Sequence, residues 1–188
     1  VFDLQPQHEL VPAPPALDLL NDEADPYLLE IPSFQMETTD SLAPLAATVL
    51  NISADHLDRH GTLERYAELK EKLLKAAELA VVNVDDPLVA AMGARHPRVA
   101  AFSVRKELAR GYSVVTSKGE RWLARDLTPL LRSAELKVSG THNEANALAA
   151  LALTEPLVPD VEAELDTLRT FKRLSHRSQR ETEDKRET

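Results

Sequence analysis

The chain contains no cysteine and only five glycines among its 188 residues. Without a thiol it can form neither a disulfide framework nor a thiolate metal site, and it is compatible with a reducing compartment such as the cytoplasm. The glycines are scattered, and even the nearest two, Gly111 and Gly119, lie eight positions apart. Phosphate-cradling loops need clustered glycines, because their backbone N–H groups approach the phosphate where a Cβ would stand. The sequence therefore contains neither a Walker loop nor a dinucleotide-binding fingerprint.

Long apolar runs and an excess of positive charge are also missing. No apolar run reaches the roughly 18 residues that a membrane-spanning helix needs, so we expect no membrane span. The 31 acidic side chains outnumber the 22 basic ones and give a net charge of -9. Such a surface repels phosphates, so we expect no nucleic-acid partner. What is present, 43% apolar and 28% charged residues, suits one globular α/β domain.

Apolar runs of strand length alternate with amphipathic helical patterns along the chain. The runs predict strands at 27–31, 46–52, 80–84, 99–104 and 135–139, and a hairpin formed by 112–116 and 121–125. The patterns predict helices over 33–39, 62–79, 87–93, 143–153 and 161–171. In the first of these helices we expect Ser33 as the N-cap, with Phe34 and Met36 facing inward. The fold class is therefore α/β, a mostly parallel sheet flanked by helices with an added antiparallel hairpin.

Composition divides the chain into three segments. Residues 1–15 are proline-rich and predicted to be irregular, and residues 16–171 form the expected α/β domain. Residues 172–188 contain only one apolar side chain, Leu174, and we expect a charged, disordered tail there. The chain starts with valine and shows no signal region, so we expect it to be cut from a longer protein.

Two groups of polar side chains follow the first two predicted strands. Glu30 ends the strand 27–31, and the carboxyl ends of parallel strands are where ligands gather. The loop after the strand 46–52 carries five charged or imidazole side chains: Asp55, His56, Asp58, Arg59 and His60. Imidazole nitrogens and carboxylate oxygens suit a divalent cation or a phosphate-bearing substrate. The alternative for Glu30 is a carboxylate that accepts hydrogen bonds from nearby N–H groups. The alternative for the loop is a polar segment whose charges are solvated.

Two further candidates lie on predicted helices. Lys70 follows Tyr66 by four positions and Leu69 by one, so it either is solvated or edges the apolar stripe, where burial would lower its pKa. Asn143 and Asn146 lie three positions apart near a helix start and share one face. Paired amides suit a nucleotide base or ribose, whereas simple N-capping by Thr141 or Asn143 is the alternative.

Six stretches of the sequence carry a family resemblance. They are Leu29–Thr39 (LEIPSFQMETT), Asn51–His60 (NISADHLDRH), Tyr66–Lys70 (YAELK), Val82–Asp86 (VNVDD), Ser139–Ala150 (SGTHNEANALAA) and Leu174–Arg177 (LSHR). In this order and at close to this spacing, they resemble the central domain of the Mur ligases. The resemblance extends from about Ala16 to Arg177 and is greatest with the branch of the family that adds D-glutamate.

The resemblance implies a cytoplasmic, ATP-dependent ligase of peptidoglycan synthesis. Such an enzyme joins D-glutamate to UDP-linked muramoyl-alanine through an acyl phosphate, and uses ATP and two Mg²⁺ ions. The residues implied in catalysis and metal binding are Glu30 and His56 as magnesium ligands and Lys70 as a carbamylated lysine that supports the second metal. The residues implied in binding are Asn143 and Asn146 around the ATP base, Arg177 beside the nucleotide, and Ser33 and Gln35 in the muramoyl-substrate loop.

The departures from the family pattern bear on activity. The glycine-rich phosphate loop of the family is absent, as are the domains that bind UDP and glutamate. Pro32 stands where relatives usually have serine, and Ser175 stands where they usually have proline. We therefore expect a central-domain fragment, inactive alone, whose residues 172–188 are the truncated start of the missing C-terminal domain. A non-catalytic remnant or interaction module that keeps the scaffold is the alternative.

Overall fold

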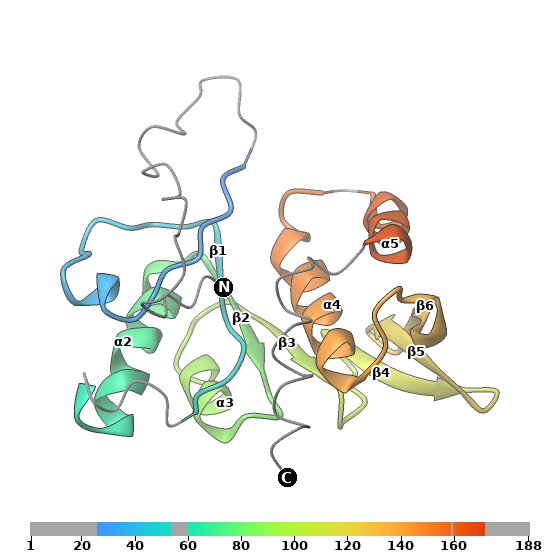
Figure 1. The fold of residues 1–188 in the computed structure, drawn as a ribbon, viewed down its shortest axis with the longest axis horizontal. Coiled ribbons are helices and arrows are strands. Elements are labelled where there is room, and N and C mark those ends of the chain that lie inside the picture. Colours follow the sequence, from blue (N-terminus) through green and yellow to red (C-terminus); the bar gives the residue numbers. More distant parts are fainter. Residues whose placement is uncertain (1–25, 54–59, 159, 172–188) are drawn as a thin grey trace, which may run out of the picture.

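A six-stranded sheet runs through the computed structural model, which describes residues 26–53, 60–158 and 160–171 (Figure 1). Its strands lie side by side in sequence order: β1 (Ala46–Val49), β2 (Leu79–Asn83), β3 (Val99–Ser103), β4 (Tyr112–Ser117), β5 (Glu120–Arg125) and β6 (Thr128–Arg132). The first four strands are parallel, and β4, β5 and β6 are joined by antiparallel pairing. This confirms the predicted fold class, including the antiparallel addition.

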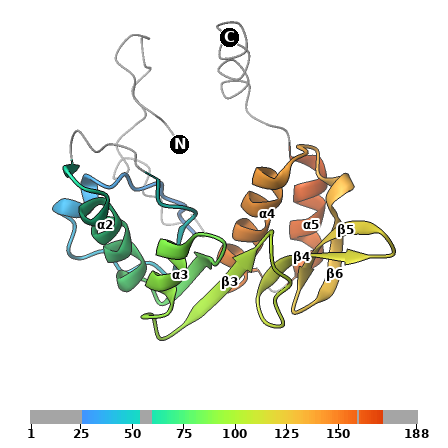
Figure 2. The ribbon, with the colours of Figure 1, turned by 90° about the horizontal axis from the view of Figure 1, so that it is seen from below.

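Helices cover both faces of the sheet (Figure 2). The helices are α2 (Leu63–Ala76), α3 (Pro87–Gly93), α4 (Thr141–Thr154) and α5 (Val161–Thr170), and two short 3₁₀ helices, η2 (Gln35–Glu37) and η3 (Ser133–Glu135), are added. Strand β2 shows how the layers form, since its alternate side chains point to opposite faces. Leu79 and Val81 pack with α4 and α5, whereas Ala80 and Val82 pack with α2 and α3. Strand positions that are buried on both faces of a sheet have to be apolar, as Leu79–Val82 are.

Helix starts follow the residues that the sequence offers as caps. Thr62 Oγ1 accepts from Arg65 N at 3.2 Å and caps the start of α2. Asp86 begins α3 by accepting from the amides of Leu88 and Val89, with Pro87 in the first turn. Helix α4 differs from both of our alternatives, because its N-cap is Gly140 and no side chain caps it.

Three predicted elements are wrong. Residues 27–31 form no strand and their side chains are mostly exposed, since the run pairs with no strand of the described chain. The strand expected at 135–139 is also absent, because the chain forms β6 earlier and then turns through η3. The sequence did not predict β6 because it contains Pro129, which argues against a strand. Proline is tolerated in a strand at the edge of a sheet, and β6 is such an edge strand. The helix expected at 33–39 shrinks to η2, where Phe34 rather than Ser33 is the N-cap.

Candidate functional site

The turn Asn83–Asp86 fastens the carboxyl ends of the parallel strands together. Asn83 Nδ2 donates to Leu50 O at 2.9 Å, and Asp86 Oδ2 accepts from Ile52 N at 2.9 Å, so both side chains hold the segment after β1. On the other side, Asp85 accepts from Ser103 Oγ at 2.6 Å and from Val104 N at 2.7 Å. The two carboxylates of this turn therefore serve the scaffold, and they fix the carboxyl edge of the sheet, where ligands of α/β proteins bind.

Lys70 lies at the edge of the apolar stripe of α2. Its Nζ stands 5.7 Å from the centre of the Tyr66 ring, and its side chain is partly buried. Burial lowers the pKa of the Lys70 amine, because a charged ammonium loses hydration there. Of the two alternatives for Lys70, a solvated side chain and one at the edge of the apolar stripe, the structure has the second.

The segment Ser33–Asp40, which we call the η2 segment, packs against α2. Ser33 is 4% exposed, and its Oγ lies 2.8 Å from His60 Nε2. Met36 is buried, whereas Gln35 and Phe34 are exposed, so the inward orientation predicted for Phe34 is wrong. The two substrate-loop candidates therefore differ: Ser33 is tied inward, and Gln35 is presented to solvent.

The magnesium-ligand candidates are only partly described. Glu30 is exposed and precedes the η2 segment, and its carboxylate is the kind of oxygen ligand that Mg²⁺ prefers. His56 lies outside the described residues, as do Asp55, Asp58 and Arg59. Within residues 26–53, 60–158 and 160–171, no group of three or more His, Asp and Glu side chains could hold a metal ion. The roles of Glu30 and His56 as magnesium ligands, and of Lys70 as the lysine that supports the second metal, stay predictions.

The amide pair lies at the start of α4, on the opposite face of the sheet from α2. Asn143 Nδ2 donates to Ser139 O at 2.7 Å and tightens the turn before the helix, whereas Asn146 is exposed. Beside them Glu144 is buried, and Arg121 of β5 donates to both of its oxygens, at 3.0 and 2.7 Å. The start of α4 is thus anchored to the sheet, with Asn146 left facing outward. Arg177, the other nucleotide candidate, lies outside the described residues.

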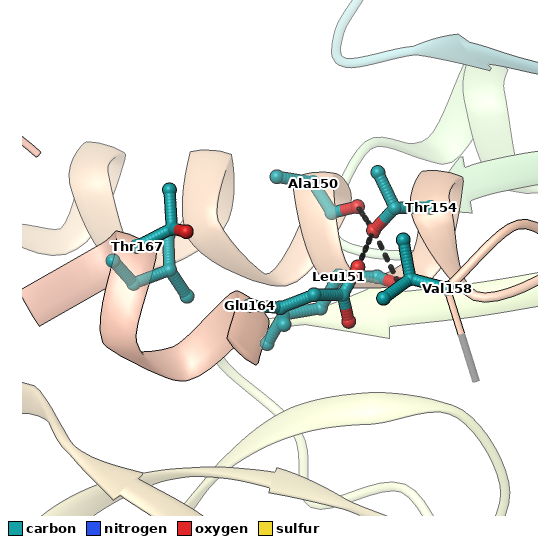
Figure 3. Close-up of a pocket in the computed structure, with 7 residues that line it drawn as sticks. Ala150, Leu151, Thr154, Val158, Glu164 and Thr167 are labelled. Carbon is teal, nitrogen blue, oxygen red and sulfur yellow. Dashed lines mark hydrogen bonds between the residues drawn. The ribbon is translucent and has the colours of Figure 1, made fainter. Parts of the chain in front are cut away.

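A hollow of about 250 Å³ opens between α4 and α5 (Figure 3). Its lining is Ala150, Leu151, Thr154, Val158, Glu164, Thr167 and Leu168. Thr154 Oγ1 bonds Ala150 O and the Glu164 carboxylate, so the two polar groups at its centre satisfy each other. None of the candidate site residues that the structure describes lines this hollow.

The sequence did not indicate the contacts that His60 makes. The ring of His60 is buried, bonds Ser33, and lies 5.5 Å from the Tyr66 ring between centroids. The sequence carries one signal for a turn next to His60, namely Gly61, whose positive φ of 75° lets the chain turn sharply between His60 and the start of α2.

In the described part of the chain, no helix is both long enough and apolar enough for a bilayer.

Comparison with known proteins gives concordant matches. Residues 11–154 match the family profile described as the Mur ligase middle domain. The chain is 46% identical over 166 residues to the UDP-N-acetylmuramoylalanine–D-glutamate ligase of Methylobacillus flagellatus, and 43% identical over 164 residues to that of Acinetobacter baylyi. These alignments cover 88% and 87% of this chain, respectively, but only 37% of each relative.

Solved structures give the same picture. A UDP-N-acetylmuramate-alanine ligase from Thermotoga maritima matches with a TM-score of 0.59 and 28% identity, over 77% of this chain and 32% of the other. A UDP-N-acetylmuramoyl-L-alanyl-D-glutamate–2,6-diaminopimelate ligase matches with a TM-score of 0.56 and 27% identity, over 69% and 28%. The chain therefore spans about a third of the length of these proteins.

Proposed function

The chain belongs to the Mur ligase family, and we propose that it forms the middle domain of a ligase that adds D-glutamate to UDP-linked muramoyl-alanine. The identity of 46% with a relative of that name supports this substrate choice. The observation that carries the proposed chemistry is Lys70, whose partial burial lowers the pKa of its amine on a helix beside the η2 segment. A ligase that consumes ATP works where ATP is supplied, so a cytoplasmic location is part of the proposal.

The proposed reaction has two steps. The muramoyl-alanine carboxylate attacks the γ-phosphorus of ATP, so that an acyl phosphate forms and ADP leaves. The amine of D-glutamate then attacks the acyl carbon, phosphate leaves, and the nitrogen gives up a proton. Positioning of the reactants and stabilisation of the phosphate charges would supply most of the catalysis, as in other phosphoryl transfers.

The residues proposed for the charged part of this site are Glu30, His56 and Lys70. The Glu30 carboxylate and a neutral His56 imidazole have the donor chemistry of metal ligands, whereas Lys70 as an ammonium does not. The nitrogen of a neutral Lys70 amine can attack carbon dioxide and release one proton to solvent, and the carbamate anion that forms would support the second metal. Magnesium, when bound, supplies charge neutralisation at the phosphates.

The remaining candidates are proposed to bind the two large substrates. Asn146, exposed at the start of α4, and Asn143 would contact the ATP base, with Arg177 beside the nucleotide. Gln35 would reach the muramoyl substrate from the η2 segment, with Ser33 holding that segment from inside. The hydrogen bond from Asn143 to Ser139 uses one of the two N–H groups of its amide, so the second N–H and the carboxamide oxygen could contact a base.

A second reading, a non-catalytic remnant that keeps the scaffold, is favoured by one observation. The printed sequence has no glycine-rich phosphate loop, since its glycines are scattered.

A domain-exchange experiment separates the two readings. The segment of the Methylobacillus flagellatus ligase that aligns with this chain is replaced by the corresponding residues of this chain, so that the relative supplies everything else.

The readout is the release of ADP that requires both D-glutamate and UDP-muramoyl-alanine. We expect the chimera to be active, because the exchanged residues would provide a working middle domain. A chimera that folds, as judged by circular dichroism and a cooperative melt, but releases no ADP would support the remnant and overturn the proposal.

A further inference from the structure

His60 is a buried polar side chain that joins two separate segments. Its side chain is 1% exposed, and its two nitrogens face two residues of the η2 segment. Nε2 lies 2.8 Å from Ser33 Oγ, and Nδ1 lies 3.5 Å from a Glu37 oxygen. The Glu37 carboxylate can only accept, so in a neutral ring Nδ1 carries the proton and Nε2 accepts from the Ser33 hydroxyl.

The same ring also contacts the helix that carries Lys70. The centres of the His60 and Tyr66 rings are 5.5 Å apart with the planes tilted by 35°, a favourable arrangement for aromatic pairs. Tyr66 in turn presents its face to Lys70 Nζ at 5.7 Å. The orientation of Tyr66, and with it the surroundings of the Lys70 amine, therefore depends on where the His60 ring lies.

A second anchor holds the other end of the η2 segment. Lys72 Nζ donates to Met36 O at 3.0 Å and to Asp40 Oδ1 at 2.7 Å. The η2 segment is therefore held on both sides of Gln35, by His60 at the Ser33 side chain and by Lys72 of α2 at the Met36 backbone. Gln35 itself stays exposed between the two anchors.

We propose that His60 is a positioning residue, which fixes Gln35 on one side and the Tyr66–Lys70 pair on the other. It would thereby hold the substrate-binding segment and the reactive lysine in one geometry. This role rests on the proposed function, because it assigns Gln35 and Lys70 to the same reaction. Productive geometries tolerate only small displacements, so a buried tie of this kind is where a binding segment gains its precision.

The order serine, imidazole, carboxylate also occurs in nucleophilic triads, where the serine attacks a substrate. Here Ser33 is only 4% exposed, so a substrate carbonyl has no approach to its hydroxyl. The arrangement therefore serves as a tie between segments.

Hydrogen exchange followed by NMR tests the tie on the 188-residue chain itself. In His60→Ala we expect faster exchange of the Ser33–Asp40 amides and a displaced Lys70 side-chain resonance, because the Tyr66 ring current moves. In His60→Gln, whose amide still reaches Ser33, the Ser33–Asp40 amides should regain their protection. Ser33→Ala, a smaller change that leaves the His60 ring in place, should loosen the η2 segment alone.

The matched control is His96→Gln, since His96 also bridges two backbone oxygens, Arg98 O at 2.7 Å and Ala77 O at 3.0 Å, away from the η2 segment. It should leave the η2 segment and Lys70 unchanged. Equal loss of protection throughout the chain in both His60 variants, or no change at Ser33–Asp40, would overturn the proposal.

Kinetics of the chimera provide the readout that a purely structural role would not move. His60→Ala should raise KM for UDP-muramoyl-alanine by about fivefold or more with a smaller change in kcat, and His60→Gln should restore most of that loss. A fall in kcat with an unchanged KM would contradict the role. If the chimera without any His60 substitution is inactive, the proposed function is wrong. The hydrogen-exchange measurement on the 188-residue chain would still test whether His60 holds the η2 segment.

Discussion

Two effects of opposite sign act on the protonation of the Lys70 amine. Burial favours its neutral amine, whereas the Tyr66 ring at 5.7 Å favours the ammonium form through a cation–π contact. The pKa of Lys70 is lowered, and the cause is burial. The effect has the direction that a carbamate-forming lysine needs, because only the unprotonated amine reacts with carbon dioxide.

This lowered pKa makes a prediction about stability. The unfolded chain binds the Lys70 proton more tightly than the folded chain, so the contribution of Lys70 to the unfolding free energy rises with pH. The rise should fall between the lowered pKa and about 10.4, the ordinary value for lysine. NMR titration of the Lys70 side chain should give a midpoint below that value, and Lys70→Met should remove the rise. A midpoint at or above the ordinary value would contradict the account.

The pairing of Ser33 with His60 shows what sequence could not supply at this scale. Both residues were visible, Ser33 in the expected substrate loop and His60 in the polar loop after the strand 46–52. Their contact spans 27 positions, and helical or strand periodicity relates only close neighbours along the chain. The residue types were therefore predictable, but the partners were not.

At the scale of elements, helix α4 is fastened to β5 through the Arg121–Glu144 pair. The hydrogen bond from Arg121 lowers the pKa of Glu144 despite its burial. Arg121→Met should lower the unfolding free energy at pH 7 by about 1–2 kcal/mol, since it leaves a buried carboxylate without its partner. Denaturant unfolding measures this loss.

Acid provides an internal check on that prediction. A carboxylate with a lowered pKa stabilises the fold above its unfolded pKa of about 4.3 and loses this contribution as pH falls. The difference between the parent chain and Arg121→Met should therefore shrink below that pH. Arg65→Met is the matched control, because Arg65 and Glu68 form an exposed pair worth less than about 0.5 kcal/mol. Equal losses in both variants would count against the buried tie.

Elements with strong periodicity were predictable, and those that depend on a neighbour were not. Helix α2 and strand β2 were anticipated because the apolar spacing, the Thr62 cap and the β-branched run all agree. Residues 27–31 have an equally apolar sequence, yet a strand forms only where another strand pairs with it. β6 was missed for the opposite reason, since pairing with β5 overrides the unfavourable Pro129.

For the whole molecule, the sheet and its two helical layers form a scaffold whose carboxyl edge is fixed by the turn Asn83–Asp86. The purified 188-residue chain should nevertheless release no ADP in response to D-glutamate and UDP-muramoyl-alanine. Its sequence has no loop of backbone amides to hold the phosphates, which removes most of the stabilisation that phosphoryl transfer requires. Substrate-dependent turnover by the chain alone would show that it holds the phosphates by other means.

The central claim is that this middle domain carries the reactive centre of a D-glutamate-adding ligase, with Lys70 in it. The most direct test is the rate of D-glutamate-dependent ADP release by the chimera carrying Lys70→Ala, compared with the chimera carrying Lys75→Ala. Lys75 lies on the same helix, is exposed, and pairs only with Glu71 among the described residues. We expect Lys70→Ala to lower the rate by about 10- to 100-fold, the usual effect of losing a group that supports a metal ligand set, and Lys75→Ala to leave it unchanged. Equal rates in the two variants would contradict the account.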